Sequence, residues 1–183
     1  MSTRMERRLE RKRLWRRDAL HFMIGGAILL AVIVLLRTYA FGLITVQGDS
    51  MMNTLSAGQV VAVDKTFFRL HEPKAGVIVI CKYPDSGDKY VKRVIALPGD
   101  EVEIRDGIAY VNGVPREEEY VDYRDHGDFG PYVVEENCVF VMGDNRANSH
   151  DSRAEGAIPQ DLLVGRVFAV FFPAKDAHFL PVT

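Results

Sequence analysis

The pattern of hydrophobic and polar residues separates an unbroken apolar run near the N-terminus from a long remainder of short apolar runs. Residues 19–36 read ALHFMIGGAILLAVIVLL and contain no Asp, Glu, Lys or Arg. As an α-helix this run spans about 27 Å, which is close to the thickness of the hydrocarbon core of a bilayer. Tyr39 and Phe41 follow it, as is typical of aromatic side chains at a membrane interface. The pattern therefore predicts one transmembrane anchor over residues 19–41.

From residue 42 onward the pattern changes to that of β-strands. Short runs rich in Val and Ile alternate with turn residues, which is typical of strands rather than of helices. The predicted strands cover residues 60–63, 77–80, 90–97, 102–104, 108–111, 139–142 and 167–172. Asp106-Gly107 and Asn112-Gly113 are residue pairs that favour tight turns. We expect residues 42–183 to form one mostly β domain built of antiparallel sheets.

One segment of this domain, residues 115–137, interrupts the strand pattern. It contains Gly127, Gly130 and Pro131. Its acidic residues include Glu117, Glu118, Glu119, Asp122, Asp125 and Asp128. Segments of this composition usually run over the surface of a domain. We interpret it as a solvated, loop-like excursion whose charge belongs to the surface and not to the chemistry.

Charge is also concentrated at the N-terminus, although the formal net charge of the whole chain is only -2. The basic residues of the arm 1–18 are Arg4, Arg7, Arg8, Arg11, Lys12, Arg13, Arg16 and Arg17, against Glu6 and Glu10. A nucleic-acid-binding tail could look like this, but the arm runs directly into the apolar run, so a membrane-flanking segment is the better interpretation. Because excess Lys and Arg stay on the cytoplasmic side, we expect a cytoplasmic arm, an extracytoplasmic domain, a lipid bilayer as partner and no nucleic acid.

Two other interpretations of the apolar run stay open. It could be the core helix of a globular domain, although its length and its flanks argue against this. It could also be a cleaved signal peptide with Thr38 and Ala40 as the small residues before the cut. The run is longer than the apolar core of a typical signal peptide, which favours an uncleaved anchor.

The cysteines and histidines do not have the spacing of a metal site. Cys81 and Cys138 form no CxxC pair, and the histidines are scattered singly at 21, 71, 126, 150 and 178. We therefore expect neither a metal nor a cofactor. A disulfide between the two cysteines and a pair of free thiols are both compatible with the sequence.

Two segments contain a candidate nucleophile and a candidate base. Ser50 lies in VQGDSMMNTL, residues 46–55, where a serine beside a glycine most often only completes a turn. Lys92 lies in YVKRVIALPGD, residues 90–100, whose apolar residues on both faces predict a central strand. A lysine buried in a strand is costly unless it is paired or neutral. Lys92 is therefore either a salt-bridge partner or a base of lowered pKa.

A third segment, MGDNRANSHDSR at residues 142–153, is almost entirely polar directly after a predicted strand. A well-satisfied turn would explain this, with carboxylates and amides capping backbone N–H groups and arginines bridging loops. A triad of Ser50, His150 and Asp151 can also be drawn. We discount the triad because adjacent residues normally point in different directions.

Together, the apolar anchor and the boxes GDSM, KRVIALPGD and GDNRANSHDSR resemble the bacterial type I signal peptidases, peptidase family S26, in content and order. The resemblance implies that Ser50 is the nucleophile, Lys92 the general base, and Ser149 the hydroxyl that positions the lysine amine. It also implies supporting roles for Asp144, Arg146, Asp151 and Arg153. The Ser50 N–H would bind the oxyanion, and Gly48 stands where some members have a second, hydroxyl donor. Apolar pockets for small substrate residues would be lined by Ile44, Val46, Met51, Leu55 and Val91.

The family's activity, carried over to this chain, is a membrane-bound serine endopeptidase that cleaves signal peptides from exported preproteins after small residues. Two departures from the family pattern stand out: Asn53 replaces the usual proline, and Lys74-Ala75-Gly76 replaces a basic-Gly-Asp turn. The self-cleaving repressors use a similar Ser/Lys pair on a related β fold, but they carry a DNA-binding N-terminal part and lack the third box. An inactive, membrane-anchored peptide-binding module is a further alternative that no residue favours.

Overall fold

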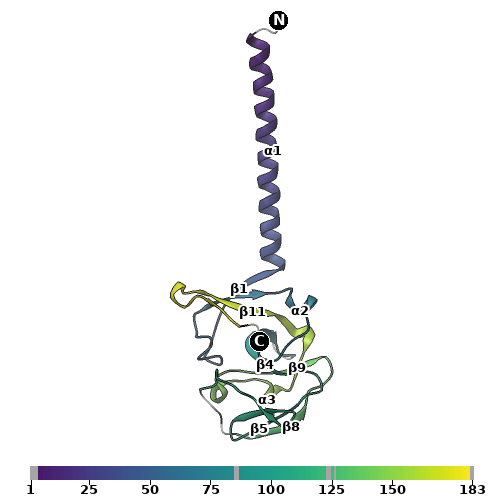
Figure 1. The fold of residues 1–183 in the computed structure, drawn as a ribbon, viewed down its shortest axis with the longest axis vertical. Helices are drawn as coiled ribbons and strands as arrows, with labels where there is room; N and C mark the ends of the chain where they lie inside the picture. The colour runs from purple at the N-terminus through teal and green to yellow at the C-terminus, as the bar shows by residue number, and fades with distance from the viewer. Residues whose placement is uncertain (1–3, 85–86, 123–124, 126, 182–183) are drawn as a thin grey trace. The chain divides into compact units, whose positions relative to one another are not determined.

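The computed structural model describes residues 4–84, 87–122, 125 and 127–181, with the side chains of the first helix from residue 14 onward. The chain divides into two compact units, Met1–Ala40 and Phe41–Thr183. The first unit is one continuous helix, α1 (Arg4–Tyr39) (Figure 1). Its part Leu14–Tyr39 is long and apolar enough to cross a membrane. The helix thus begins within the basic arm and ends at Tyr39. Phe41, the last residue of the predicted anchor, is instead the first residue of a strand.

The second unit is built of two antiparallel sheets. The larger sheet has the strand order β1 (Phe41–Thr45), β2 (Val60–Asp64), β11 (Leu163–Phe172), β3 (Ile78–Lys82), β4 (Lys89–Ala96), β9 (Cys138–Met142) and β10 (Ile158–Pro159), with β12 (His178–Phe179) paired to β11. The smaller sheet has the order β7 (Val114–Pro115), β6 (Ile108–Val111), β5 (Glu101–Arg105) and β8 (Phe129–Val133). The short helices are α2 (Phe67–Leu70), α3 (Ser152–Glu155), η1 (Arg146–Asn148), η2 (Gln160–Leu162) and η3 (Ala174–Asp176). The prediction of a mostly antiparallel β domain is confirmed.

Each predicted strand is present, with its ends shifted by a few residues at most. The two predicted turns are confirmed, because Asp106, Gly107, Asn112 and Gly113 all have φ angles between +50° and +78°. The pattern missed β1, which follows the apolar run directly, and the two-residue strands. It also missed β8, whose sequence FGPYV lies inside the acidic segment.

The centre of the larger sheet positions the candidate site. β4 lies between β3 and β9, and its residues from Lys92 to Ala96 are all buried. Apolar side chains of β4 and β9, among them Ile95 and Phe140, pack against Val102 and Ile104 of β5 and so join the two sheets. Lys92 therefore lies in a strand that is covered by protein on both edges.

Candidate active site

The turn that carries Ser50 is held by apolar side chains on its own chain. The Val46 N–H donates to the Gln59 carbonyl at 2.8 Å, which fixes the start of the turn after β1. Met51 and Leu55 are each 1% exposed and pack into the core beside β2 and β3. Truncating an apolar side chain buried this deeply costs roughly 2–5 kcal/mol. These anchors therefore hold the backbone at Ser50, whose side chain is half-buried.

Lys92 is buried, and its amine has one hydroxyl partner. The residue is 2% exposed, and its Nζ donates a hydrogen bond to the Ser149 Oγ at 3.0 Å. Burial lowers the pKa of Lys92 because the ammonium loses its hydration, and the Asp151 carboxylate opposes this shift without cancelling it. A lysine in this setting has a larger neutral fraction near neutral pH than a free lysine. It is therefore suited to accept a proton.

Gly143 is the position around which the serine turn and Ser149 meet. The Ser50 carbonyl oxygen accepts a hydrogen bond from the Asn145 N–H at 3.0 Å. A Cβ on Gly143 would lie 2.4 Å from that carbonyl oxygen and 2.3 Å from the Ser149 Oγ. Among the described residues, the Ser50 hydroxyl and Lys92 do not form a hydrogen bond with each other. The structure thus brings Ser50 and Ser149 to one backbone position, and Ser149 links that position to Lys92.

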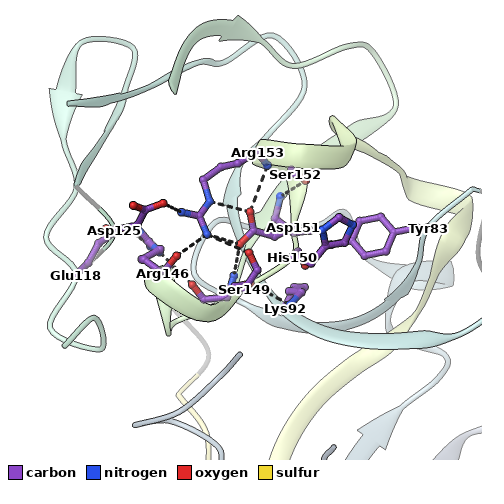
Figure 2. A network of polar contacts seen from close by, with 12 residues as sticks. Tyr83, Lys92, Glu118, Asp125, Arg146, Ser149, His150, Asp151, Ser152 and Arg153 are labelled. Atoms are coloured by element: carbon purple, nitrogen blue, oxygen red, sulfur yellow. Dashed lines mark hydrogen bonds and ion pairs between the residues drawn. The ribbon is translucent and has the colours of Figure 1, made fainter. Parts of the chain in front are cut away.

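Asp151 is fully buried and lies in the middle of the polar network in Figure 2. Its carboxylate accepts hydrogen bonds from the Arg153 Nε at 2.9 Å and from the Gly143 N–H at 3.1 Å. Burial would raise the pKa of Asp151, but the hydrogen bonds and charge of Arg153, with hydrogen bonds from Ser149 and Gly143, hold it below its usual value. Arg153 also donates to the Arg146 carbonyl at 2.8 Å. Three of the predicted supporting residues, Arg146, Asp151 and Arg153, are therefore linked by hydrogen bonds.

Arg93, the neighbour of Lys92 in β4, forms a buried ion pair with Asp144. Its Nε and one terminal nitrogen lie 2.8 and 2.7 Å from the two Asp144 oxygens. The Thr54 hydroxyl donates to Asp144 at 2.5 Å, and Arg93 also donates to the Gly76 carbonyl at 2.8 Å. A paired guanidinium and carboxylate offset each other's loss of hydration. Arg93 and Thr54 therefore support the site, although the sequence analysis gave neither a role.

Arg146 pairs with Glu118, a residue of the acidic segment. Two Arg146 nitrogens lie 2.9 and 2.5 Å from the Glu118 oxygens, and both side chains are at most 2% exposed. The Arg146 Nε donates to the Gly143 carbonyl at 3.0 Å. The interpretation of the acidic segment as surface charge is therefore wrong for Glu118. The pattern could not single it out, because it lies between two exposed glutamates.

The His150 ring faces away from a triad with Ser50. Its Nε2 lies 2.5 Å from the Glu155 carboxylate, and its side chain is 60% exposed. Figure 2 shows the ring beside Tyr83, with the ring centroids 6.0 Å apart. In the described part of the chain, the ring and the Asp151 carboxylate do not share a hydrogen bond. The geometry therefore gives no support to the triad that the sequence analysis discounted.

A cavity of about 390 Å³ lies beside the serine turn. It is lined by Ile44, Thr45, Val46, Gln47, Ser50, Met51, Ile80, Asp88, Lys89, Tyr90 and Val91. Of the five predicted pocket residues, only Leu55 is not in this lining; its side chain packs in the adjacent core. Gly48 lies in the same turn, two residues before Ser50, and has a φ of +73°.

Both cysteines are free thiols, which answers the question that the sequence left open. Cys81 is buried, and burial raises its pKa to about 12. Cys138 is half-buried. Among the described residues, no group of three or more His, Cys, Asp or Glu side chains could hold a metal ion.

The comparison with known proteins identifies the family. A family model described as "Signal peptidase, peptidase S26" matches residues 19–172. The chain belongs to this peptidase family. Signal peptidase I T of Bacillus subtilis is 41% identical over 165 residues, which are 83% of this chain and 86% of the relative. Probable signal peptidase I-1 of Synechocystis is 37% identical over 156 residues, which are 81% of this chain and 80% of the relative. A crystal structure of a signal peptidase I from Enterococcus faecalis is 32% identical, covers 52% of this chain and 97% of that chain, and has a TM-score of 0.48.

The peptidase is therefore a hydrolase of a serine peptidase family that cleaves signal peptides. This confirms the resemblance seen in the sequence motifs and sets the self-cleaving repressors aside. Asn53, the first departure, has a φ of +87°, which an asparagine adopts more readily than most residues and a proline cannot adopt. At the second departure, Gly76 has a φ of +90°, and its carbonyl accepts from Arg93. Both departures thus occur at backbone positions that suit the residues present.

Proposed function

We propose that this peptidase is a membrane-anchored endopeptidase that removes signal peptides from exported preproteins, with Ser50 as nucleophile and neutral Lys92 as general base. The observation that carries the proposal is the buried Lys92 amine, which donates a hydrogen bond to the Ser149 hydroxyl. That hydroxyl and the Ser50 carbonyl oxygen both lie against Gly143. Catalytic hydrogen bonds are often long without substrate and tighten in the substrate complex. A direct bond between Ser50 and Lys92 is therefore expected in that complex.

Ser149 is suited to orient the lysine amine. Its hydroxyl is one of the groups that lower the pKa of Asp151, and the ionised carboxylate has no hydrogen to give, so Ser149 would be the donor between the two. The Ser149 oxygen then has its lone pairs left for an N–H of Lys92. A neutral amine that donates to Ser149 keeps its own lone pair for another proton. The proposed donor of that proton is the Ser50 hydroxyl.

The proposed reaction is acyl transfer in two stages. Lys92 takes the Ser50 proton as the Ser50 oxygen attacks the scissile carbonyl, and the ammonium so formed returns the proton to the leaving amine. Water then attacks the acyl-enzyme, again with Lys92 as base, and frees the carboxylate product and Ser50. The negative charge of Asp151 favours the transient ammonium and limits the cost of charging a buried lysine. The Ser50 N–H would bind the oxyanion, with the turn at Gly48 as the source of the second donor.

The cavity beside Ser50 supports an extended substrate with small side chains. Its volume of about 390 Å³ is shared among several substrate residues, and Ile44, Val46 and Val91 give it an apolar wall. Signal-peptide cleavage sites have small residues at the first and third positions before the cut. β1 is an edge strand of the larger sheet, so the segment that follows it is accessible to a substrate backbone that adds as a further strand.

Membrane attachment is proposed through α1. Its apolar part is long enough to cross a bilayer, and the basic residues precede that part. By the positive-inside rule, the N-terminus would be cytoplasmic and the β domain extracytoplasmic. The active site would then face the side on which exported preproteins emerge.

The test is cleavage of a purified preprotein by the detergent-solubilised full-length chain. We expect one cut at the signal-peptide boundary, identified by mass spectrometry of both products, and no cut by Ser50→Ala. Ser56→Ala, which changes an exposed serine of the same segment, is the matched control and should cleave like the wild type. Cleavage by Ser50→Ala at the wild-type rate would refute the assignment of the nucleophile.

A further inference from the structure

The acidic segment inserts two side chains, Glu118 and Tyr120, into the charged groups behind the active site. The Glu118 side chain is fully buried and pairs with Arg146 through both of its oxygens. The Tyr120 hydroxyl donates to Glu118 at 3.1 Å, and the Tyr120 ring lies 3.8 Å from the guanidinium carbon of Arg93. We call Glu118 and Tyr120 the clasp. It contacts both of the arginines that flank the site.

Each of these arginines contacts or directly follows a residue of the proposed site. Arg146 donates through its Nε to the Gly143 carbonyl at 3.0 Å. Arg93 follows Lys92 in β4 and pairs with Asp144, which follows Gly143. The clasp thus holds the backbone at residue 143 and the middle of β4, next to Lys92.

The guanidinium geometry makes the Arg146 contact rigid. The fork of Arg146 is planar, so two bonds to Glu118 on one side fix the direction of the Nε bond to Gly143 on the other. A buried guanidinium without its carboxylate would have to move toward water or admit water. Either change would release the Gly143 carbonyl.

Tyr120 keeps the clasp closed over the working pH range. Burial, and then the Glu118 carboxylate, raise the pKa of Tyr120 to about 12. The hydroxyl therefore stays protonated near neutral pH and continues to donate to Glu118. The ring covers one face of Arg93, a favourable arrangement for a cation and an aromatic ring.

We propose that Glu118 is a positioning residue of the peptidase, which acts through Arg146 to hold Gly143, and with it Ser50 and Ser149, in reactive alignment. This inference rests on the proposed Ser50 and Lys92 mechanism. It gives the acidic segment a part in catalysis, although no atom of Glu118 is expected to touch the substrate.

The test compares Glu118→Gln with Glu119→Gln in the full-length, detergent-solubilised chain. Both variants remove one carboxylate from adjacent positions, but only Glu118 is buried. The wild type and Ser50→Ala are assayed in parallel on the same preprotein at a temperature well below each Tm. Glu118→Gln should lower kcat by about 10- to 100-fold, the range expected for a displacement of up to 1 Å at reacting groups. KM should change by less than about twofold, and Glu119→Gln should match the wild type.

The acid limb of the pH profile of kcat/KM separates positioning from a structural role. Four groups act on the charge of Lys92: Asp151, Cys81, Arg153 and Asp144. Their field and the burial of Lys92 together set its pKa. Water admitted by Glu118→Gln would hydrate the ammonium, so it should raise the pKa of Lys92 and move the acid limb to higher pH. If Glu118 influenced Lys92 only through its negative charge, removing that charge would lower the pKa of Lys92 and move the acid limb to lower pH. A variant that is merely less stable would leave the limb where it is.

The outcomes are distinct. Absence of Ser50-dependent cleavage by the wild type would overturn the proposed function itself. With that cleavage present, an unchanged kcat, or a lower kcat with an unmoved or lowered acid limb, would overturn the positioning role alone. If Glu118→Gln does not fold, Tyr120→Phe decides, because it keeps the ring on Arg93 and removes only the bond to Glu118. It should lower kcat by about two- to tenfold with the same direction of shift, and a wild-type kcat for this variant would contradict the proposal.

Discussion

Gly143→Ala adds one methyl group at the position where Ser50 and Ser149 meet. The new Cβ would lie 2.3 Å from the Ser149 Oγ, 2.7 Å from the Ser149 Cβ and 2.4 Å from the Ser50 carbonyl oxygen. The backbone itself accepts an alanine, because the φ of Gly143 lies outside the left-handed region. Ordinary contact begins at 3.4 Å, so each of the two oxygens lies about 1 Å too close to the new Cβ. The Ser50 oxygen cannot rotate away, since it belongs to the backbone.

The expected effect on catalysis is separate from the effect of crowding on folding stability. A displacement of about 1 Å between reacting groups can lower the rate by about 100-fold. At about 1.4 kcal/mol per factor of ten, this is a loss of roughly 2.7 kcal/mol of transition-state stabilisation. Overpacking a buried position costs about 1–3 kcal/mol of folding stability. We therefore expect Gly143→Ala to fold with a lower Tm, a kcat about 100-fold below that of the wild type and a similar KM.

Gly165→Ala is the matched control. Its Cβ would lie 2.5 Å from the Asp64 carbonyl oxygen and 2.8 Å from the Val63 Cγ1, so it crowds β2 and not the serine turn. Kinetics of preprotein cleavage and denaturant unfolding of both variants give the rates and the stabilities. Both variants should lose stability, and Gly165→Ala should keep its kcat. Equal kcat values for the two variants would show that the junction at Gly143 does not govern the alignment.

Lys92→Met should abolish cleavage in a folded domain. Because burial lowers the pKa of Lys92 from its ordinary 10.5, the folded state binds fewer protons than the unfolded chain between the two pKa values, so wild-type stability falls as pH drops through that window. Denaturant unfolding at several pH values gives the free energy of unfolding as a function of pH. This free energy should change less with pH in Lys92→Met than in the wild type, and an identical pH dependence would contradict the lowered pKa. Ser149→Ala removes the hydroxyl that lies 3.0 Å from the Lys92 amine and should lower kcat by about 10- to 100-fold with folding preserved. Preprotein cleavage gives the rate and thermal melts give the stability. A wild-type kcat would rule out the positioning role of Ser149. Protease added to intact spheroplasts should digest the β domain, as the basic arm requires, whereas protection until lysis would reverse the topology.

Sequence periodicity determined the class of the fold. Side chains of a strand alternate between two faces, so runs such as residues 102–104 and 108–111 indicate strands from their neighbours along the chain alone. The apolar helix and the turns at Asp106-Gly107 and Asn112-Gly113 are local features of the same kind. The motifs also marked Ser50, Lys92 and residues 142–153 as candidates for chemistry. A polar group that is buried with a strand is costly unless it is hydrogen-bonded, paired or neutral. For the composition of the strands and the location of the boxes, the order of residues was sufficient.

Tertiary structure alone decided which of these groups are buried together. Glu118 and Arg146 are 28 residues apart, and Lys92 and Ser149 are 57 apart, yet each pair is in hydrogen-bonding contact. The pattern gives three consecutive glutamates the same appearance, but only the middle one leaves water, because only it meets a buried guanidinium. The energy of a charge depends on its distance from other charges and from solvent, and these distances are set when remote strands pair. For this reason the serine and lysine boxes could be located in the sequence, whereas the surroundings of Gly143 and the contacts of the clasp required the folded chain.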